Sequence, residues 1–212
     1  MNSDQIESFI DGVVGLSSVD RFHGHQTVAN QSVADHSCRV AMIAQAIALE
    51  YYNGDVIKAN AATVAALFHD FSEGLLKNDA NSSVKDKYGI REALKQLETD
   101  VITTTFKTAS GDLDTTVLRN LMLEKCSRTD YSILKIADTL DFGLYIWNES
   151  MLGNKHVANM FTSFRTELSK YPEKIIKLPI VECIFQKIMQ QDVEYVDILM
   201  ADFVNDHGDN PN

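Results

Sequence analysis

The sequence is poor in the residues that interrupt helices and in those that cross-link small domains. It has 10 glycines and 3 prolines among 212 residues, and its apolar residues recur at helical rather than alternating spacing. This combination argues against a strand-rich fold and predicts an all-α protein. Its 3 cysteines, Cys38, Cys126 and Cys183, form no C-x-x-C pair. All three lie in apolar helical runs, so we expect buried free thiols in a reducing compartment rather than disulfides or a zinc cluster.

Basic residues and long apolar runs are also scarce. The chain has 19 lysines and arginines against 30 aspartates and glutamates, a formal net charge of −11. It therefore lacks the basic surface that binds a nucleic-acid polymer, although a few local cations or a metal ion can still bind a small anion. No apolar run approaches the roughly 18 residues of a membrane span. The acidic start MNSDQIESFI does not resemble an export leader, so we expect a cytoplasmic protein without a membrane partner.

No repeat, low-complexity tract or Pro/Gly-rich linker divides the chain. The sequence therefore predicts one domain over residues 1–204 and a flexible tail over 205–212. Ser32, followed by Asp35 three residues later, has the pattern of a helix N-cap with a capping box. The run at 132–150 is apolar on nearly all sides and is expected to form the central helix. The other expected helices cover residues 3–15, 33–52, 55–75, 88–107, 110–125, 155–170 and 179–204.

The stretch AALFHDFSEGLL, residues 65–76, places a histidine and an aspartate side by side in an apolar helical run. On a continuous helix His69 and Asp70 lie about 100° apart and can point into one cavity, with Glu73 on the same face. A buried ionised carboxylate is costly unless it is paired or bound to a metal. Taken alone, such a pair is better explained by a hydrogen-bonded core histidine beside an aspartate that faces water.

Two further positions favour a metal site. His36 lies on the apolar stripe of its helix, and Asp138 lies at the centre of the apolar run ILKIADTLDFGLY, where a carboxylate needs a strong partner. The alternatives are that His36 is a packed core histidine and that Asp138 pairs with Arg39 or Lys135. Asp141, one turn later, is an alternative inward carboxylate.

Together these three helices would bring two imidazoles and two carboxylates to one place. A mixed nitrogen and oxygen site of this kind suits Mn²⁺, Co²⁺, Zn²⁺, Fe²⁺ or Mg²⁺. A divalent ion there lowers the pKa of bound water and neutralises charge that develops on phosphorus. Glu73 is not needed as a ligand, which makes it the candidate general acid or base.

The ordered set His36, His69-Asp70 and Asp138 resembles the motif of the HD-domain metal phosphohydrolases. Within them the chain is most similar to the 5'-deoxynucleotidases, through DRF, ADHSCRVAMIA, FHDFSEGLL, VK and LKIADTLDFGLY, which span well over half the chain. Compact viral enzymes that remove triphosphate from dATP are similar as well. The resemblance implies a compact HD-domain helical bundle. It further implies that these four residues ligate the metal, with Asp70 and Glu73 in the catalytic centre and Glu73 assisting the attacking water or the leaving group.

The same resemblance implies a set of substrate contacts. Arg21 matches the arginine that meets the substrate phosphate, and Phe22 occupies the place of an aromatic residue, usually Trp, that packs against the sugar. Asp79 is the best match for the loop aspartate that contacts the sugar, although LLKNDANSSVK departs from the family's TGD-P pattern. Lys77 and Lys85 are candidates for additional positive charge near the phosphate. Phe in place of Trp leaves a larger pocket, which could change the choice of sugar or base.

The leading hypothesis is a phosphohydrolase of 2'-deoxynucleotides, in which metal-bound water attacks the α-phosphorus of a 5'-monophosphate. The products are a deoxynucleoside and phosphate. The alternative substrate is a dNTP, namely dATP, which would release triphosphate. Two hypotheses of other classes are a non-catalytic sensor that binds metal or nucleotide and a structural helical module without metal. The presence of Glu73 argues against the sensor, and metal analysis of the purified protein discriminates the structural module.

The expected partners follow from the same analysis. The small-molecule partner is a deoxynucleotide. The apolar C-terminal runs VECIFQKIM and YVDILMADF favour a homodimer or a higher homo-oligomer, unless they complete the monomer's own core. For a viral protein the expected location is the host cytoplasm.

Overall fold

The computed structural model describes residues 1–22, 25–79, 87–107 and 115–190. Within these ranges the chain is helical and has no strand, which confirms the all-α prediction. An isolated β-bridge joins Asp20 to Ser32. None of the helices in the described ranges has both the length and the apolar character of a membrane span.

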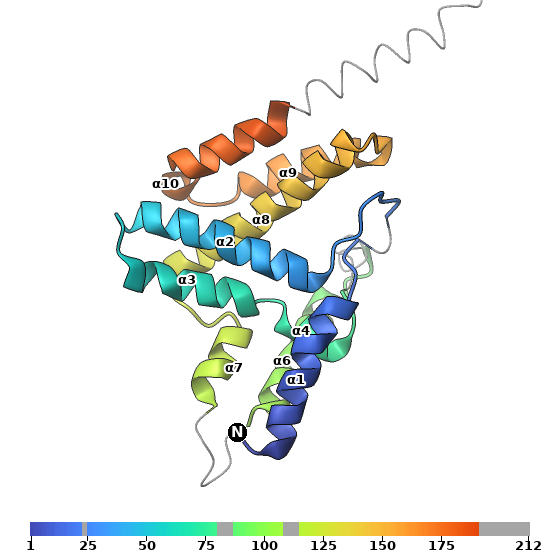
Figure 1. The fold of residues 1–212 in the computed structure, drawn as a ribbon, viewed down its shortest axis with the longest axis vertical. Helices are drawn as coiled ribbons and strands as arrows, with labels where there is room; N and C mark the ends of the chain where they lie inside the picture. The colour runs from blue at the N-terminus through green and yellow to red at the C-terminus, as the bar shows by residue number, and fades with distance from the viewer. Residues whose placement is uncertain (23–24, 80–86, 108–114, 191–212) are drawn as a thin grey trace, which may run out of the picture.

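The helices follow one another in a bundle, in which α8, the longest helix among those with bounds in the described ranges, crosses behind α2 and α3 in Figure 1. Their bounds are α1 (Ser3–Ser18), α2 (Val33–Tyr51), α3 (Val56–Phe68), α4 (Phe71–Leu76), α6 (Arg91–Thr105), α7 (Thr116–Met122), α8 (Arg128–Met151), α9 (Ala158–Leu168) and α10 (Glu173–Ile176), with a 3₁₀ turn at Lys155–Val157. Residues 179–190 are also helical. The rest of the predicted 179–204 helix, and the predicted tail, lie outside the described residues.

The predicted N-cap of α2 is confirmed. The Ser32 hydroxyl accepts a hydrogen bond from the Asp35 backbone N–H at 3.1 Å, and the Asp35 carboxylate accepts one from the Ser32 N–H at 3.3 Å. This reciprocal pair satisfies two backbone donors that a helix start leaves free. It fixes where α2 begins, and therefore where His36 lies one turn into the helix.

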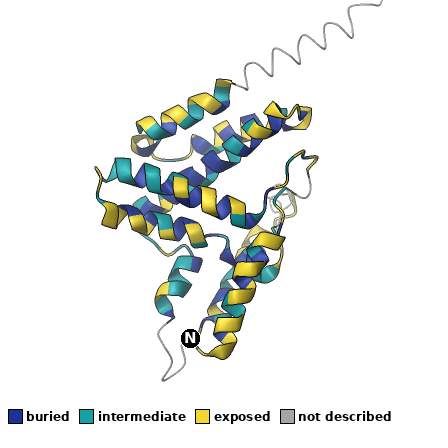
Figure 2. Cartoon of the chain, viewed as in Figure 1, coloured by how far each residue is buried: buried dark blue, intermediate teal, exposed yellow. Residues whose placement is uncertain are grey.

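The core has two parts, and the dark blue residues of Figure 2 show both of them along the helix faces. The larger part lies between α2, α3, α8 and α9 and contains the buried run of α8, so the prediction of a central helix is confirmed. The smaller part consists of Phe71, Ile102, Phe106 and Met122, from α4, α6 and α7, with α1 packed against it. The link between α3 and α4 connects the two parts.

Two expectations from the sequence are wrong. The helix expected over 55–75 is broken: α3 ends at Phe68, and α4 starts after Asp70, whose φ of −105° and ψ of 18° are not helical. The cysteines are not buried, because Cys38 and Cys183 are exposed and Cys126 is half-buried. Cys38 lies two residues after the buried His36, so on the same helix it points away from the core.

Candidate metal centre

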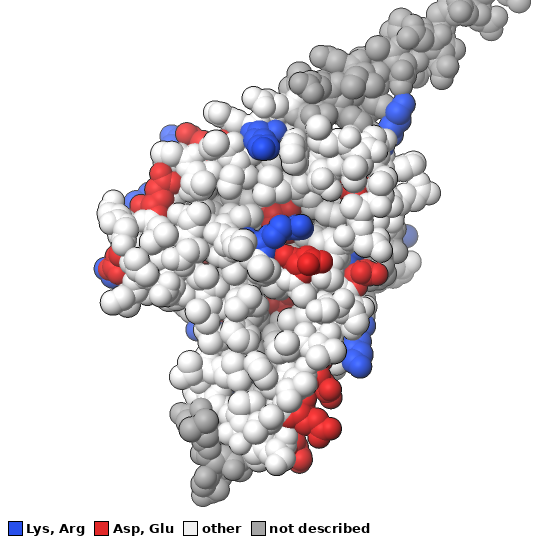
Figure 3. All heavy atoms as spheres, in the orientation of Figure 1, with Lys and Arg blue, Asp and Glu red and all other residues white. Residues whose placement is uncertain are grey.

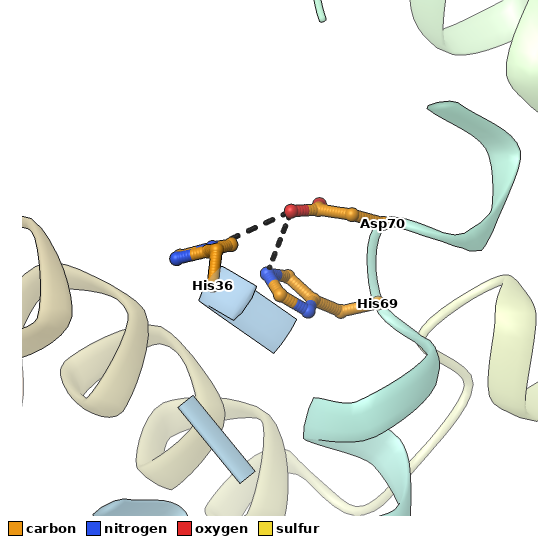
Figure 4. A group of neighbouring side chains, drawn as sticks. All are labelled: His36, His69 and Asp70. Carbon is orange, nitrogen blue, oxygen red and sulfur yellow. Dashed lines mark ion pairs between the residues drawn. The ribbon is translucent and has the colours of Figure 1, made fainter. Parts of the chain in front are cut away.

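Side chains from three places in the fold converge where the α3–α4 link passes α2 and α8. His36 comes from α2, His69 and Asp70 come from the link, and Asp138 comes from α8. Figure 4 shows the first three pointing toward one another. One ligand atom from each of these three lies within 4.8 Å of the others, which is close enough for a shared metal ion.

The distances between these groups are short. The Oδ2 atom of Asp70 lies 3.1 Å from His69 Nε2 and 3.4 Å from His36 Nε2. The Oδ1 atom of Asp138 lies 3.3 Å from the same His36 nitrogen. The residues that the sequence grouped as ligands are therefore neighbours in the described structure.

The Nε2 atoms of His36 and His69 are buried, and within the described structure neither makes a hydrogen bond of acceptable geometry. A buried polar atom without a partner is costly. A divalent cation between the two imidazoles and the two carboxylates would satisfy both nitrogens. The donor set therefore fits a metal ion of the kind that accepts mixed nitrogen and oxygen ligands.

The other ring nitrogen of each histidine contacts an acceptor. His36 Nδ1 lies 2.7 Å from Asp141 Oδ2, and His69 Nδ1 lies 2.7 Å from the carbonyl oxygen of Ala66. Because an ionised carboxylate and a carbonyl only accept, each Nδ1 carries a hydrogen, and each Nε2 faces the cavity, where its lone pair becomes available to a metal ion once that nitrogen is deprotonated. Both imidazoles are thus oriented as ligands.

Asp141 is fully buried and occupies the side of His36 opposite to Asp138. It also accepts hydrogen bonds from Arg39 Nε at 2.7 Å and from Gln31 Nε2 at 3.0 Å. The two carboxylates that the sequence left as alternatives therefore both face His36, at different ring nitrogens. Of the cations suggested as partners of Asp138, Arg39 pairs with Asp141 and Lys135 pairs with Glu124 at 2.6 Å.

The electrostatic balance of the cluster favours a cation. Burial and the nearby Arg21 charge lower the pKa of His36, but the three surrounding aspartates outweigh them and raise it to about 10. Burial raises the pKa of Asp70, and the neighbouring histidines hold it well below its usual range. The pKa of Asp138 is lowered in the same way, against the effect of burial, chiefly by His36. The carboxylates are therefore ionised at neutral pH, and the cavity attracts positive charge.

The predicted catalytic glutamate lies next to this cluster along the chain. Glu73 is in the first turn of α4, half-buried, and its backbone N–H donates to the carbonyl of Asp70 at 3.0 Å. Lys77 ends α4 in a left-handed conformation with φ of 52° and is exposed, and Asp79 after it is half-buried. Lys85 lies outside the described residues.

The predicted substrate residues Arg21 and Phe22 lie on the connection between α1 and α2. The Arg21 side chain is only 14% exposed, and its Nη1 contacts His36 Nδ1 and lies 3.6 Å from Asp141 Oδ2. Phe22 has φ of 60° and stacks on Tyr145 of α8, with 4.3 Å between ring centroids. In this structure the guanidinium therefore lies against the centre itself, and the aromatic ring lies against α8.

The surface gives little sign of a nucleic-acid interface on the face drawn in Figure 3. Most of the described atoms there belong to uncharged residues, acidic groups lie along the edges, and blue and red side chains meet near the middle. A nucleic-acid polymer needs a continuous basic surface, and the described part of this face does not show one.

Comparison with known proteins identifies the family. Residues 8–193 match the family described as 5'-deoxynucleotidase YfbR-like. The chain belongs to this family of HD-domain phosphohydrolases. The resemblance seen in the sequence is thereby confirmed at the level of the family. A comparison with curated protein sequences finds no match.

Solved structures show the same fold. An HD-domain phosphohydrolase from Listeria innocua is 22% identical with a TM-score of 0.57, and the match covers 91% of this chain and 98% of that one. The PH0347 protein from Pyrococcus horikoshii OT3 is 23% identical with a TM-score of 0.66, over 88% and 99%. The HD phosphohydrolase DatZ of cyanophage S-2L, bound to dA and one catalytic Zn²⁺ ion, is 15% identical with a TM-score of 0.54, over 88% and 95%.

Some residues around the centre were not predicted from the sequence, namely Gln31, Tyr145 and Glu149. Asp141, Tyr145 and Glu149 recur every four residues on α8, so they share one face of the helix. Polar residues at that spacing in an otherwise apolar helix are the signal that points to them.

Proposed function

We propose that the protein is a divalent-metal-dependent phosphohydrolase that releases phosphate from 2'-deoxynucleoside 5'-monophosphates. The observation that carries the proposal is the pair of buried Nε2 atoms, on His36 and His69, that face two carboxylates and have no hydrogen-bond partner in the described structure. Membership of the YfbR-like family supports the deoxynucleotide as substrate.

His36, His69, Asp70 and Asp138 would hold the ion. When bound, the ion supplies a Lewis acid that acidifies water and neutralises negative charge on the phosphate. Glu73 takes a proton from the attacking water and returns it to the 5'-oxygen. The bond from water oxygen to phosphorus forms as the bond from phosphorus to the 5'-oxygen breaks, so the products are a deoxynucleoside and inorganic phosphate.

The substrate's remaining contacts come from the connection between α1 and α2 and from the segment after α4. Arg21 supplies positive charge to the phosphate, and Phe22 flanks the sugar. Asp79 accepts a hydrogen bond from the sugar, while Lys77 and Lys85 add positive charge nearby. These assignments rest on the resemblance of the sequence to the family, supported for Arg21 by its contact with His36.

The pairing of the cations supports a monophosphate. Besides Arg21, which is assigned to the phosphate, the nearby cations Arg39 and Lys135 are paired with Asp141 and Glu124. A 5'-monophosphate carries about two negative charges at pH 7, and a triphosphate carries more and needs more positive charge along its tail. The alternative substrate, dATP with release of triphosphate, draws its support from the shared fold with the cyanophage enzyme bound to dA.

The test is turnover by protein loaded in turn with Mn²⁺, Co²⁺, Zn²⁺ and Mg²⁺, on a panel of dNMPs, NMPs and dNTPs with products resolved by chromatography. We expect phosphate from dNMPs, and at least a 1000-fold loss, on the order of 4 kcal/mol, in Asp70→Ala. Asp100→Ala, an exposed aspartate on α6, is the matched control and should retain full activity. Triphosphate from dATP would establish the alternative. Absence of turnover with every metal would refute both and leave the sensor hypothesis.

A further inference from the structure

The connection between α1 and α2 is held closed at its base. We call its described parts, residues 20–22 and 25–32, the α1–α2 loop. At the base, the Arg21 N–H donates to the Gln31 carbonyl at 2.8 Å, and the Val33 N–H donates to the Val19 carbonyl at 2.9 Å. Arg21 and Phe22 lie just inside this closed base, so the position of the loop decides where both side chains point.

The far part of the loop is held by α8. The two carboxylate oxygens of Glu149 accept hydrogen bonds from consecutive backbone N–H groups, Val28 at 2.8 Å and Ala29 at 2.7 Å. The Tyr145 hydroxyl donates to the Ala29 carbonyl at 2.9 Å. Asn154, just after α8, donates through Nδ2 to the Gln26 carbonyl at 2.8 Å.

Glu149 is fully buried, which is unusual for a carboxylate. Besides the two loop amides, Asn154 Nδ2 donates a third hydrogen bond to this carboxylate at 2.6 Å. Hydrogen bonds to a charged group are stronger than neutral ones, and leaving such a group unsatisfied is costly. The carboxylate and the loop therefore depend on each other: if the loop moves away, Glu149 loses two of these three donors.

Phe22 of the α1–α2 loop also packs against α8. Its ring stacks on that of Tyr145, and its φ of 60° is a conformation that a bulky residue adopts only when its surroundings impose it. Tyr145 thus contacts the loop twice, through its ring at Phe22 and through its hydroxyl at Ala29. The same face of α8 also bears Asp141, which contacts Gln31 and the metal-centre residue His36.

We propose that Glu149 is a positioning residue that fixes the α1–α2 loop against α8, and thereby sets Arg21 and Phe22 in the place where they bind the deoxynucleotide. The link to substrate binding rests on the proposed function, whereas the hold on the loop does not. Glu149 acts on affinity for the nucleotide through the loop, while His36, His69 and Asp70 remain in place to bind metal.

The test compares Glu149→Gln with the wild type as full-length, metal-loaded protein. Glutamine keeps the shape but has one acceptor oxygen and turns an NH₂ group toward a backbone N–H or toward Asn154. We expect KM for a dNMP to rise about tenfold with a smaller change in kcat, an unchanged Kd for Zn²⁺, and faster amide hydrogen exchange in residues 25–32. Glu50→Gln is the control. Like Glu149, Glu50 accepts a hydrogen bond from a backbone N–H, that of Ile180 at 3.0 Å, but it lies at the end of α2 far from the α1–α2 loop.

The outcomes separate the two proposals. An unchanged KM in an active Glu149→Gln variant, or unchanged hydrogen exchange in the loop, would overturn the positioning role. If the wild type hydrolyses no nucleotide, the proposed function fails, and hydrogen exchange alone then decides whether Glu149 holds the loop.

If Glu149→Gln does not fold, a second variant is available: Tyr145→Phe removes only the hydroxyl that donates to Ala29. It should raise KM about threefold and speed exchange in the same peptide, and no change in either would refute the proposal.

Discussion

At the scale of single residues, the two ring nitrogens of His36 have different tasks. Nε2 faces Asp70 and Asp138, and Nδ1 contacts Asp141. Carboxylates on both sides fix the orientation of the His36 ring. A carboxylate behind a ligand histidine sets the tautomer and raises the basicity of the nitrogen that binds metal.

Replacement of Asp141 by asparagine tests this arrangement. The amide is nearly isosteric but uncharged, and it offers Arg39 and His36 one acceptor oxygen in place of two. We expect the Kd for Zn²⁺ to rise 10- to 100-fold, which is about 1.4 to 2.7 kcal/mol, measured by isothermal titration calorimetry or chelator competition.

The control for this prediction is Asp130→Asn. Asp130 is a buried aspartate on the same helix, bonded to Tyr52 and Ser127 rather than to the metal centre. Its replacement should lower the free energy of unfolding and leave the Kd for Zn²⁺ unchanged. Equal metal affinity in Asp141→Asn and the wild type would show that Asp141 has no influence on the ligand histidine.

The sequence predicted the grouping of His36, His69, Asp70 and Asp138, because buried polar residues in apolar helices stand out. It left Asp138 and Asp141 as alternatives, since residues three apart on a helix share a face and differ only in which atom of a neighbour they reach. For Glu149 the four-residue spacing on α8 marks the residue but does not show its partners. Two of its partners are backbone N–H groups, which leave no pattern in a sequence.

At the scale of helices, the break between α3 and α4 is the feature that the sequence did not predict. No glycine or proline marks it. It follows from tertiary packing: the alanines of α3 pack in the larger core, whereas Phe71 packs in the smaller one beside Phe9 and Phe106. The chain must turn at His69 and Asp70 so that α3 packs in the larger core and α4 in the smaller one. That turn brings the side chains of His69 and Asp70 together.

The position of α4 depends on a close crossing with α1, which Gly15→Ala tests. A Cβ atom at Gly15 would lie 2.1 Å from the carbonyl oxygen of Gly74. Glycine to alanine inside a helix normally stabilises by about 0.5–1 kcal/mol. Here we expect the opposite sign, a loss of about 1–3 kcal/mol, because backbone rather than a flexible side chain must move.

Urea unfolding of Gly15→Ala measures this effect, with Ser17→Ala as the control at an exposed position of the same helix. Since α4 begins next to Asp70, we also expect weaker Zn²⁺ binding in Gly15→Ala. A variant as stable as the wild type would show that α1 and α4 can separate without cost.

At the scale of the whole molecule, the sequence predicted the helical class and the central place of α8, because a helix that is apolar on most sides must be buried. It did not predict the division into two cores, which depends on how helices meet rather than on their own patterns. The proposed substrate is an anion, and it must bind a protein of net charge −11. A bound cation in an acidic cavity is what reconciles the two, so metal occupancy and substrate affinity should rise together.

Metal binding should therefore depend on pH, with a sign set by His36. In the metal-free protein its pKa is raised to about 10, so at pH 7 it holds a proton that the ion must displace. We expect release of about one proton per Zn²⁺ and about a tenfold gain in affinity for each pH unit between 6 and 8.5. Titration calorimetry in two buffers of different ionisation enthalpy measures the proton count, and a count of zero would contradict the raised pKa.

Stability should follow the same linkage: the free energy of unfolding of the metal-free protein falls as pH rises, while the stability added by a fixed Zn²⁺ concentration grows. A raised pKa means that His36 contributes stability below its unfolded value of 6.5, and this is lost as the pH rises toward 10. The lowered pKa values of Asp70 and Asp138 contribute stability above 3.8 that is lost in acid. The metal-free protein should therefore lose stability from pH 7 to 9.

Zn²⁺ at a concentration of 100 Kd should add about 2.7 kcal/mol at any pH. Because Kd falls as pH rises, a fixed Zn²⁺ concentration should stabilise the protein more at pH 8.5 than at pH 6. Thermal unfolding across this range, with and without Zn²⁺, would contradict the assignment if the added stability were independent of pH.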